Sequence, residues 1–123
     1  MIEGIGIDVV EIDRIQRLFN IYESKFSERL LTTKELTYFI TIKNPTRKVE
    51  WLAGRFAAKE AISKAIGTGI QHDLTFKDIE ILPAANGKPI VTLHKKGEIT
   101  LHLSITHTQY YAQALAIVEI ERK

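Results

Sequence analysis

Apolar positions recur along this chain with two different periods, and the change of period divides it into segments. Between residues 12 and 67 apolar side chains return every three or four positions, which is the spacing of amphipathic helices. Before that stretch, and again after residue 76, apolar and polar side chains alternate, as in half-buried strands. The order strand, helices, strands predicts an α+β fold in which one long helix packs on an antiparallel sheet.

The long helix is predicted over the stretch from Trp51 to Gly69, which is rich in alanine and long enough for about five turns. Asn44 and Pro45 offer an N-cap and a first-turn proline, and Gly67 is a natural C-terminal stop. Small side chains recur at three- and four-residue spacing, so we expect one face of this helix to lie close against the sheet. These positions are Gly54, Ala57, Ala58, Ala61 and Ala65.

Three shorter helices are predicted between the first strand and the long helix. Asp13 is expected to cap the first, which runs to about Asn20, and residues 24–31 form the second. Thr32 and Glu35 have the spacing of a capping box, in which each side chain satisfies the backbone amide of the other, and this box opens the third helix.

The first strand, residues 2–10, has two unlike faces because strand side chains alternate. One face carries Ile5, Ile7 and Val9, and the other carries Gly4, Gly6 and Asp8. Glycine inside a strand often marks close approach by a ligand or by another backbone. An acid that follows two glycines on one face is therefore a candidate functional group, and it also fits a role in capping the next helix.

The remaining strands are predicted at 76–82, 89–93, 100–107 and 112–121. Asn86-Gly87, inside the turn 83–87, is a strong hairpin signal between the first two of these strands. Residues 95–98 form another polar break. The last two strands follow one another closely enough to pair antiparallel.

Composition and charge narrow the classes of function. At 123 residues, with 45% hydrophobic and 26% charged residues, the chain has the profile of one soluble globular domain spanning residues 1–123. The net charge is +2 and the basic residues are spread along the chain, which gives no indication of a nucleic-acid partner. No apolar run approaches the roughly 20 residues of a membrane span, and no signal peptide is recognisable, so we expect no membrane partner and a cytoplasmic location. The lack of cysteine excludes disulfides and a cysteine nucleophile, and it agrees with a reducing compartment.

Asp8 and Glu60 are two carboxylates on rigid predicted elements. Together they suit Mg²⁺, which takes one or two carboxylates plus substrate phosphates and water. A divalent ion with cations around it supplies the charge neutralisation that displacement at a diphosphate needs. The cations available are Arg55, Lys64, Lys88 and His107.

Each of these residues also has an ordinary structural explanation. Glu60 and Lys64 have the spacing of an exposed helical ion pair, and a turn lysine such as Lys88 or a strand-end histidine such as His107 is commonly solvated. No P-loop or dinucleotide-binding glycine motif is present. Spacing alone therefore indicates a candidate magnesium and phosphate site and no particular reaction.

Four segments of the chain closely resemble one family. They are GIGIDVVEIDRI at 4–15, RFAAKEAISKAIGTG at 55–69, NGKP at 86–89 and SITHTQYYAQALAIV at 104–118. Their order and the total length are similar to those of the holo-acyl-carrier-protein synthase family, the small homotrimeric branch of the 4'-phosphopantetheinyl transferases. The resemblance implies transfer of 4'-phosphopantetheine from coenzyme A to a serine of an acidic apo-acyl-carrier protein, in fatty acid biosynthesis, with release of adenosine 3',5'-bisphosphate.

The same resemblance implies roles position by position. It makes Asp8 and Glu60 the Mg²⁺ ligands, and it places Lys64 beside the diphosphate as a third catalytic residue. The residues that it assigns to coenzyme A are Arg55, Lys64, Gly87, Lys88, Pro89, His107 and Thr108. It assigns docking of the carrier protein to Arg14 and Arg17. The base that removes the serine proton stays open between a metal-held water, Glu60 and Lys64.

Arg55 and Glu60 are poorly placed to face one ligand from the same helix, because five residues at 100° per residue set them about 140° apart. Since the family is trimeric, we predict that sites lie at subunit interfaces, with Arg55 of one subunit completing the site that holds Asp8 and Glu60 of its neighbour. The small residues of the last strand are then expected at a tight subunit interface: Ala112, Ala114 and Ala116.

Two other classes of function fit the same residues. A Mg²⁺-dependent phosphohydrolase acting on nucleotides would use the same carboxylates and would need no carrier protein. A non-enzymatic module would bind a carrier protein or a nucleotide through Arg14, Arg17 and the basic loop, and Asp8→Ala would leave its binding intact. The family resemblance favours the transferase.

Overall fold

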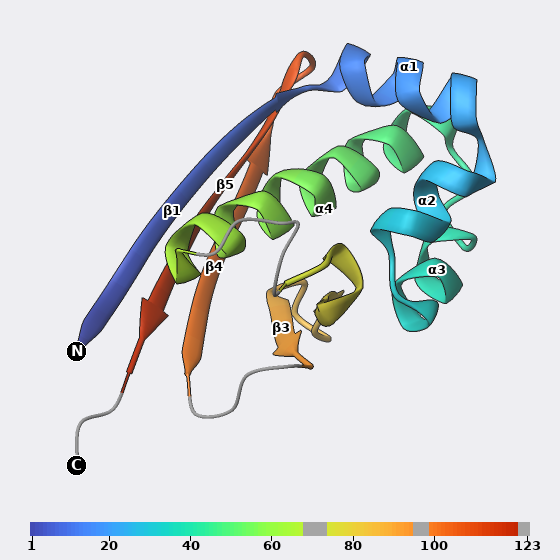
Figure 1. Ribbon diagram of the computed structural model, residues 1–123. Helices are drawn as coiled ribbons and strands as arrows, with labels where there is room; N and C mark the ends of the chain where they lie inside the picture. The colour runs from blue at the N-terminus through green and yellow to red at the C-terminus, as the bar shows by residue number, and fades with distance from the viewer. Residues whose placement is uncertain (68–73, 95–98, 121–123) are drawn as a thin grey trace.

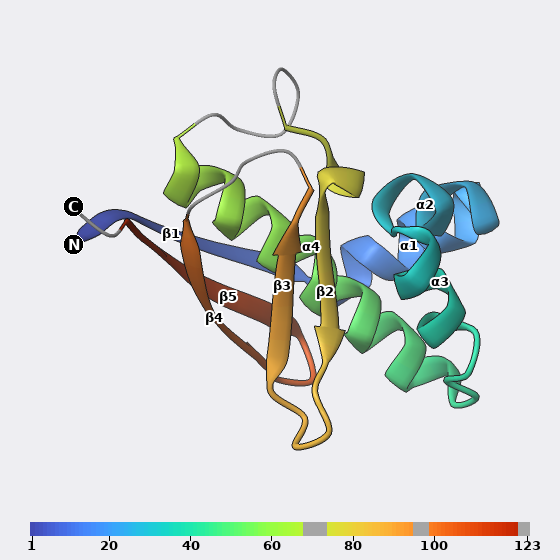
Figure 2. The same ribbon diagram turned by 90° about the horizontal axis from the view of Figure 1, so that it is seen from below.

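One long helix organises the fold. Helix α4, Pro45–Ile66, lies across one face of a three-stranded antiparallel sheet, and a two-stranded antiparallel sheet lies beside the same helix (Figure 1, Figure 2). The computed structural model describes residues 1–67, 74–94 and 99–120. This arrangement confirms the predicted α+β class with a long helix on an antiparallel sheet.

The strands and short helices follow the predicted order. The larger sheet has the strand order β1-β5-β4, with bounds Ile2–Glu11, Tyr111–Glu119 and Thr100–His107. The smaller sheet pairs β2, Ile79–Pro83, with β3, Pro89–Leu93. Three short helices gather at the N-terminal end of α4 in Figure 1: α1 (Ile12–Tyr22), α2 (Ser24–Leu30) and α3 (Thr33–Phe39).

The ends of α4 and the start of α3 confirm the local signals in the sequence. The Asn44 side chain accepts the backbone amide of Arg47 at 3.1 Å, which satisfies one of the free amides of the first turn of α4. Gly67 ends α4 in the left-handed conformation, with φ of 94°. Thr32 and Glu35 form the predicted capping box in full.

The two glycines of β1 let that strand touch the α4 backbone. A Cβ atom on Gly4 would collide with the carbonyl of Ala65, and one on Gly6 would collide with the carbonyl of Ala61. The prediction that these glycines mark a close approach is therefore confirmed, and the partner is backbone rather than ligand. Because Asp8 follows on the same strand face, the close approach also brings its carboxylate to the last turns of α4.

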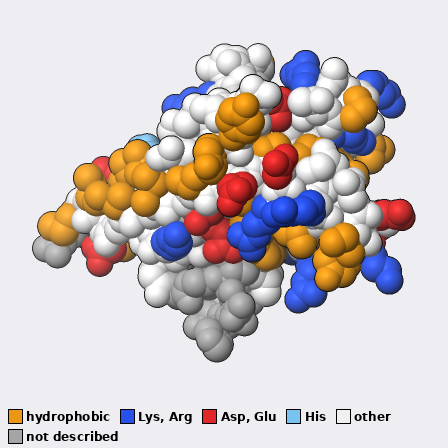
Figure 3. All heavy atoms as spheres, turned by 90° about the horizontal axis from the view of Figure 1, so that it is seen from above, with side chains coloured by type: hydrophobic (Ala, Val, Ile, Leu, Met, Phe, Trp, Pro, Cys, Tyr) orange, Lys and Arg blue, Asp and Glu red, His pale blue; other side chains and the backbone are white. Residues whose placement is uncertain are grey.

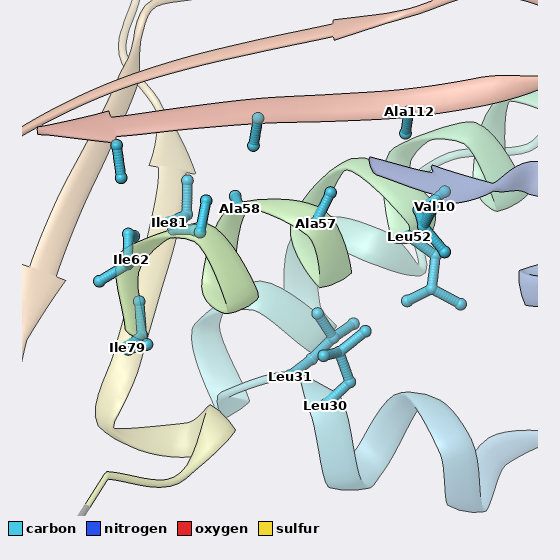
Figure 4. Close-up of a cluster of buried hydrophobic side chains, with 14 of the residues drawn as sticks. Val10, Leu30, Leu31, Leu52, Ala57, Ala58, Ile62, Ile79, Ile81 and Ala112 are labelled. Carbon is cyan, nitrogen blue, oxygen red and sulfur yellow. The ribbon is translucent and has the colours of Figure 1, made fainter. Parts of the chain in front are cut away.

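The face of α4 with small side chains is buried, as predicted. Ala57, Ala58 and Ala61 have no exposed surface. Figure 4 shows Ala57 and Ala58 turned towards β5, with Leu30 and Leu31 on another side of the same helix. The core of the molecule thus surrounds α4.

The alanines of β5 face α4 rather than another subunit. Ala112, Ala114 and Ala116 are at most 1% exposed. The prediction that they lie at a subunit interface is therefore wrong, because their small size serves the packing of α4 on the sheet. The opposite face of the sheet is the exposed one, and on β1 it presents large apolar side chains: Ile5, Ile7 and Val9.

Several element boundaries differ from the sequence-based prediction. The long helix α4 begins at Pro45 rather than at Trp51, and two further differences have a local cause. Asp13 does not cap α1: the N-cap is Glu11, and Asp13 lies in the first turn, where an acidic side chain still favours the helix dipole. Residues Phe76–Asp78 form a 3₁₀ turn, η1, instead of the start of β2. Thr75 and Asp78 cap this turn reciprocally, and that local bonding competes with the strand.

Some predictions lie outside the described residues. They are the polar break at 95–98 and the final two residues of the stretch ending at Gly69. The last strand, predicted to reach Glu121, ends at Glu119. Among the residues that are described, no helix combines the length and apolarity needed to cross a membrane.

Candidate functional site

Three of the predicted site residues meet where β1 crosses the C-terminal turns of α4. We call Asp8, Glu60 and Lys64 the acidic cluster. The Lys64 Nζ donates to Asp8 Oδ1 at 3.0 Å and to the backbone carbonyl of Ile7 at 3.1 Å. The ion pair of Lys64 is therefore with Asp8 rather than with Glu60 one turn earlier on the helix. The long-range contact joins strand and helix into one polar site.

Burial and the neighbouring Asp8 carboxylate both affect the pKa of Glu60. Burial raises the pKa of Glu60 above its ordinary value, and the Asp8 charge raises it further, while Lys64 and Arg14 oppose the shift. The two carboxylates are thus close enough to repel one another, so a cation bound between them would relieve the repulsion. Lys64 supplies only part of that compensation, because more than half of its side chain is exposed to water.

An open cavity of about 750 Å³ adjoins Glu60. Its walls come from α2 and from η1, with Arg29 and Phe76 among the lining residues. On the neighbouring face, Arg14 lies 5.8 Å above the ring of Phe56, and Phe56 packs against Phe76. Figure 3 shows acidic and basic side chains gathered on this side of the molecule, next to a row of hydrophobic side chains.

A second group of predicted residues lines a different cavity. We call it the Arg55 cavity; its volume is about 260 Å³. It is bounded by α4, the β2–β3 loop and the end of β4. The predicted coenzyme A residues among its lining are Arg55, Gly87, Pro89 and His107.

Arg55 is the most confined charge in this cavity. It is 8% exposed, its Nε donates to the Ile81 carbonyl at 3.3 Å, and its Cζ lies 4.3 Å above the ring of Trp51. Burial lowers the pKa of Arg55 to about 10, while Glu35 and Tyr38 oppose the shift, so the guanidinium stays charged at neutral pH. Within the described residues its Nη groups donate no hydrogen bond, which leaves buried cationic donors beside an open cavity.

His107 has a carboxylate partner that the sequence did not indicate. Its Nε2 lies 3.7 Å from Glu50 Oε2, and both residues line the Arg55 cavity. Trp51, which stacks on Arg55, was also missed as a site residue. Its signal was available, because Trp51 and Arg55 are four residues apart on one helix and so lie on the same face.

Lys88 and Thr108 flank the cavity without being among its lining residues. Lys88 is exposed in the β2–β3 loop, where its backbone amide donates to the Asn86 side chain at 3.0 Å. The Thr108 hydroxyl accepts the amides of Tyr110 and Tyr111, so it stabilises the β4–β5 turn. Arg14 and Arg17 lie exposed on α1. Arg14 is on the side of the acidic cluster, because its charge affects the pKa of Glu60.

Behind the site, a lysine beside Glu60 is completely buried. Lys59 Nζ donates to Glu35 Oε1 at 2.6 Å and to the carbonyls of Leu30 and Phe76 at 2.7 and 2.9 Å. Burial lowers the pKa of Lys59, and Glu35 opposes this. No sequence pattern indicated this pair, because a lysine in a Lys-Glu dipeptide on a helix is normally solvated.

The predicted site residues thus form two groups that do not meet within one chain. Glu60 lines the larger cavity and Arg55 lines the smaller one, and among the described residues none lines both. The acidic cluster offers two carboxylates and an ammonium group, as a metal and diphosphate site requires. The Arg55 cavity offers a buried guanidinium and a histidine, as a phosphate-binding site requires.

Comparison with known proteins gives one consistent result. Residues 4–117 match the 4'-phosphopantetheinyl transferase superfamily. The chain is 51% identical over 119 residues to the holo-[acyl-carrier-protein] synthase of Geobacillus sp. (strain WCH70), covering 97% of this chain and 98% of the relative. It is 48% identical to that of Bacillus subtilis (strain 168), covering 97% of each.

Solved structures agree with the sequence comparison. The fold superposes with a TM-score of 0.90 on a holo-(acyl-carrier-protein) synthase from Bacillus anthracis in complex with CoA (3',5'-ADP), at 44% identity, covering 98% of this chain and 99% of that one. It superposes with a TM-score of 0.82 on the Helicobacter pylori enzyme in complex with coenzyme A, at 37% identity, covering 94% and 99%. The fold is that of a phosphopantetheine-transferring enzyme. The chain belongs to the 4'-phosphopantetheinyl transferase superfamily, in its holo-[acyl-carrier-protein] synthase family.

Proposed function

We propose that this chain transfers 4'-phosphopantetheine from coenzyme A to a serine of apo-acyl-carrier protein, the activation step of fatty acid biosynthesis. The main observation in support is that the predicted site residues form two separate groups in one chain. A pair of carboxylates that a cation would stabilise lies at one end of α4, and a buried guanidinium with free donors lies in a separate cavity. Coenzyme A, with a diphosphate and a further phosphate, carries anionic groups for both.

The reaction exchanges one phosphorus–oxygen bond for another. The serine oxygen bonds to the phosphorus that carries pantetheine, and the bond from this phosphorus to the oxygen bridging the diphosphate breaks. The bridging oxygen leaves with adenosine 3',5'-bisphosphate, and the serine proton passes to a base. Because the leaving group and the attacked phosphate are both anionic, the protein must supply positive charge around them.

Asp8 and Glu60 are the residues that would hold Mg²⁺. Two carboxylates suit an ion that fills its remaining positions with water and substrate phosphate. Burial and then the Asp8 charge raise the pKa of Glu60, and such an ion would relieve the repulsion between the two carboxylates. Across the described residues no group of three or more histidine, cysteine or acidic side chains is placed to hold a metal, so substrate oxygens are needed to complete the coordination. When bound, Mg²⁺ would neutralise the diphosphate and polarise the phosphorus under attack.

Lys64 serves as a cation rather than as the base. Its Nζ already donates to Asp8 and to the Ile7 carbonyl, so it is engaged as a hydrogen-bond donor. It can turn from Asp8 towards the diphosphate because its side chain is long and more than half exposed. This leaves Glu60, or a water molecule beside it, to accept the serine proton.

We infer that the active unit is a homotrimer whose sites lie between subunits. Arg55 and Glu60 line separate cavities of one chain, which supports a site that takes its acidic cluster from one subunit and its Arg55 cavity from the next. The exposed outer face of the larger sheet supports an interface. Ile5, Ile7 and Val9 are each more than half exposed there, and Leu115, the cross-strand neighbour of Ile7, continues the apolar surface.

The acidic carrier protein would dock on α1. Arg14 and Arg17 are exposed on that helix, and Arg14 is near enough to Glu60 to affect its pKa. A carrier bound there would present its serine on the side of the acidic cluster. Charge complementarity of this kind mainly directs encounter and orientation.

An intact-mass measurement tests the proposed function. Purified protein, coenzyme A, Mg²⁺ and an apo-acyl-carrier protein are mixed, and the assay is repeated with EDTA and with Glu60→Gln. We expect the carrier to gain roughly 340 Da, the mass of one phosphopantetheine attached covalently, and we expect the gain to disappear in both repeats. No gain with several apo carriers, from a folded protein that still binds coenzyme A, would favour a binding module instead.

A further inference from the structure

Trp51 contacts both the aromatic side chains of α3 and the guanidinium of Arg55. The Arg55 Cζ lies 4.3 Å from the centroid of the Trp51 ring. The ring centroids of Tyr38 and Phe39 lie 5.4 and 5.8 Å from the same Trp51 centroid. We propose that Trp51 is a positioning residue for coenzyme A: it holds the Arg55 guanidinium so that the outer donors face the cavity. The proposal rests on the proposed function, in which Arg55 binds a phosphate of coenzyme A.

Arg55 needs such a support because few other contacts fix it. Its Nε is anchored on the Ile81 carbonyl at 3.3 Å, and among the described residues this is its one hydrogen bond. A single anchored donor leaves the guanidinium plane free to rotate about that contact. The indole face of Trp51 defines the plane. Within the part of the chain that the structure describes, Arg55 forms no ion pair with a carboxylate, and the cation–π attraction of Trp51 offsets part of the cost of burying its charge.

Trp51 is itself held by a rigid stack. Its ring is tilted by 30° to that of Phe39 and by 33° to that of Tyr38, and Phe39 packs edge-on against Phe19 of α1. The stack therefore connects α1, α3 and α4 to the wall of the Arg55 cavity. Because Trp51 is only partly buried and lines that cavity, its replacement changes the cavity wall more than the core.

The test compares Trp51→Leu with Trp51→Phe in the transfer assay. We expect Trp51→Leu to raise the KM for coenzyme A about tenfold, the scale of losing a desolvated cation–π contact, with kcat within about twofold of wild type. Trp51→Phe keeps an aromatic face and should stay within about threefold. The KM for the carrier protein should not change in either variant.

A double-mutant cycle separates positioning from direct contact between Trp51 and the ligand. If Trp51 acts through Arg55, Trp51→Leu adds nothing to the KM for coenzyme A once Arg55→Ala is present. The same increase in both backgrounds would overturn the proposal and indicate that Trp51 touches coenzyme A itself. An unchanged KM in Trp51→Leu would overturn it as well.

Phe19→Leu is the matched control, because it removes a ring from the same stack without touching Trp51. It should leave the KM for coenzyme A unchanged, and an equal rise in this control would show that loss of packing alone explains the effect. If the wild-type protein bound coenzyme A but transferred nothing, the proposed function would fail separately. Calorimetric Kd values for coenzyme A would then replace KM in the same cycle.

Discussion

Asp8 and Lys64 form an ion pair that water can reach, whereas Arg55 is almost completely buried under Trp51. More than half of the Lys64 side chain in the first contact is exposed, so this contact can open when a ligand with stronger charges arrives. The second is held by stacking and by one backbone carbonyl, so its free donors are in place before any ligand binds. The acidic cluster is therefore suited to groups whose charge changes during the reaction. The Arg55 cavity is suited to binding an anionic group that does not react.

This difference predicts different kinetic signatures for the two regions. Changes in the acidic cluster should lower kcat, because in the proposed reaction its groups face the charge that develops in the transition state. Changes around Arg55 should raise KM, because a phosphate that does not react is bound equally in the ground state and the transition state.

Glu60→Gln should have the largest effect. The amide keeps the shape of the side chain but loses the charge needed for a divalent cation and for accepting a proton, so we expect kcat to fall about a thousandfold. The steady-state rate of carrier modification measures this. Glu28→Gln is the control, because Glu28 lines the cavity beside Glu60 and is exposed on α2, and it should stay within about twofold of wild type. A comparable loss in both variants would contradict a specific role for Glu60.

Arg55→Ala should have the next largest effect, and it should change the KM for coenzyme A rather than kcat. Losing charge-assisted hydrogen bonds to a phosphate should raise the KM for coenzyme A about thirtyfold and change kcat little. Arg29→Ala removes an exposed arginine from the other cavity and should leave this KM unchanged. A fall in kcat at unchanged KM for Arg55→Ala would remove the distinction between the two regions.

Arg14→Ala should affect neither region directly. We expect about a fivefold rise in the KM for the carrier protein, which should diminish at high salt because the contact is exposed. The KM for coenzyme A should stay constant. If Arg14→Ala changed only the KM for coenzyme A, α1 would not be the docking helix.

The pH dependence of stability should show the smallest effect. Burial and Asp8 raise the folded-state pKa of Glu60, so protonated Glu60 favours folding, and this contribution is lost as the pH rises through that pKa. Without metal at pH 7, Glu60→Gln should therefore melt slightly higher than wild type, by roughly 1–2 °C because the group is only partly buried. The difference should vanish below the pKa of an unfolded glutamate. A lower melting temperature at pH 7 would mean that ionised Glu60 stabilises the fold.

Local chemistry explains which parts of the fold were predictable from sequence. The caps at Thr32, Asn44 and Gly67 depend on residues within one helical turn, so their patterns were sufficient. The same logic was available for η1, since Thr75 and Asp78 have the spacing of a reciprocal cap, but the strand-like alternation from Phe76 onwards concealed it. The alanines of β5 were assigned to the wrong partner because small residues indicate close packing without indicating against what.

Long-range pairing explains what the sequence did not predict at the site. Spacing grouped Lys64 with Glu60, but the fold pairs Lys64 with Asp8, 56 positions away in sequence. Lys59 looked like a solvated lysine, yet it is completely buried against Glu35. The roles of Asp8 and Glu60 followed from family resemblance, because their nearness depends on where β1 crosses α4.

The measurement that tests the central claim most directly is complementation between two defective chains. Asp8→Ala and Arg55→Ala proteins are dissociated together and reassembled at equal amounts, with subunit mixing verified by native mass spectrometry, and transfer is measured at low coenzyme A. If each site takes its acidic cluster and its Arg55 cavity from different subunits, about a quarter of the sites in a random mixture are intact, and activity should rise well above that of either parent. Activity no higher than the average of the two parents, in proven mixed assemblies, would contradict the shared site and place both halves of the chemistry within one chain.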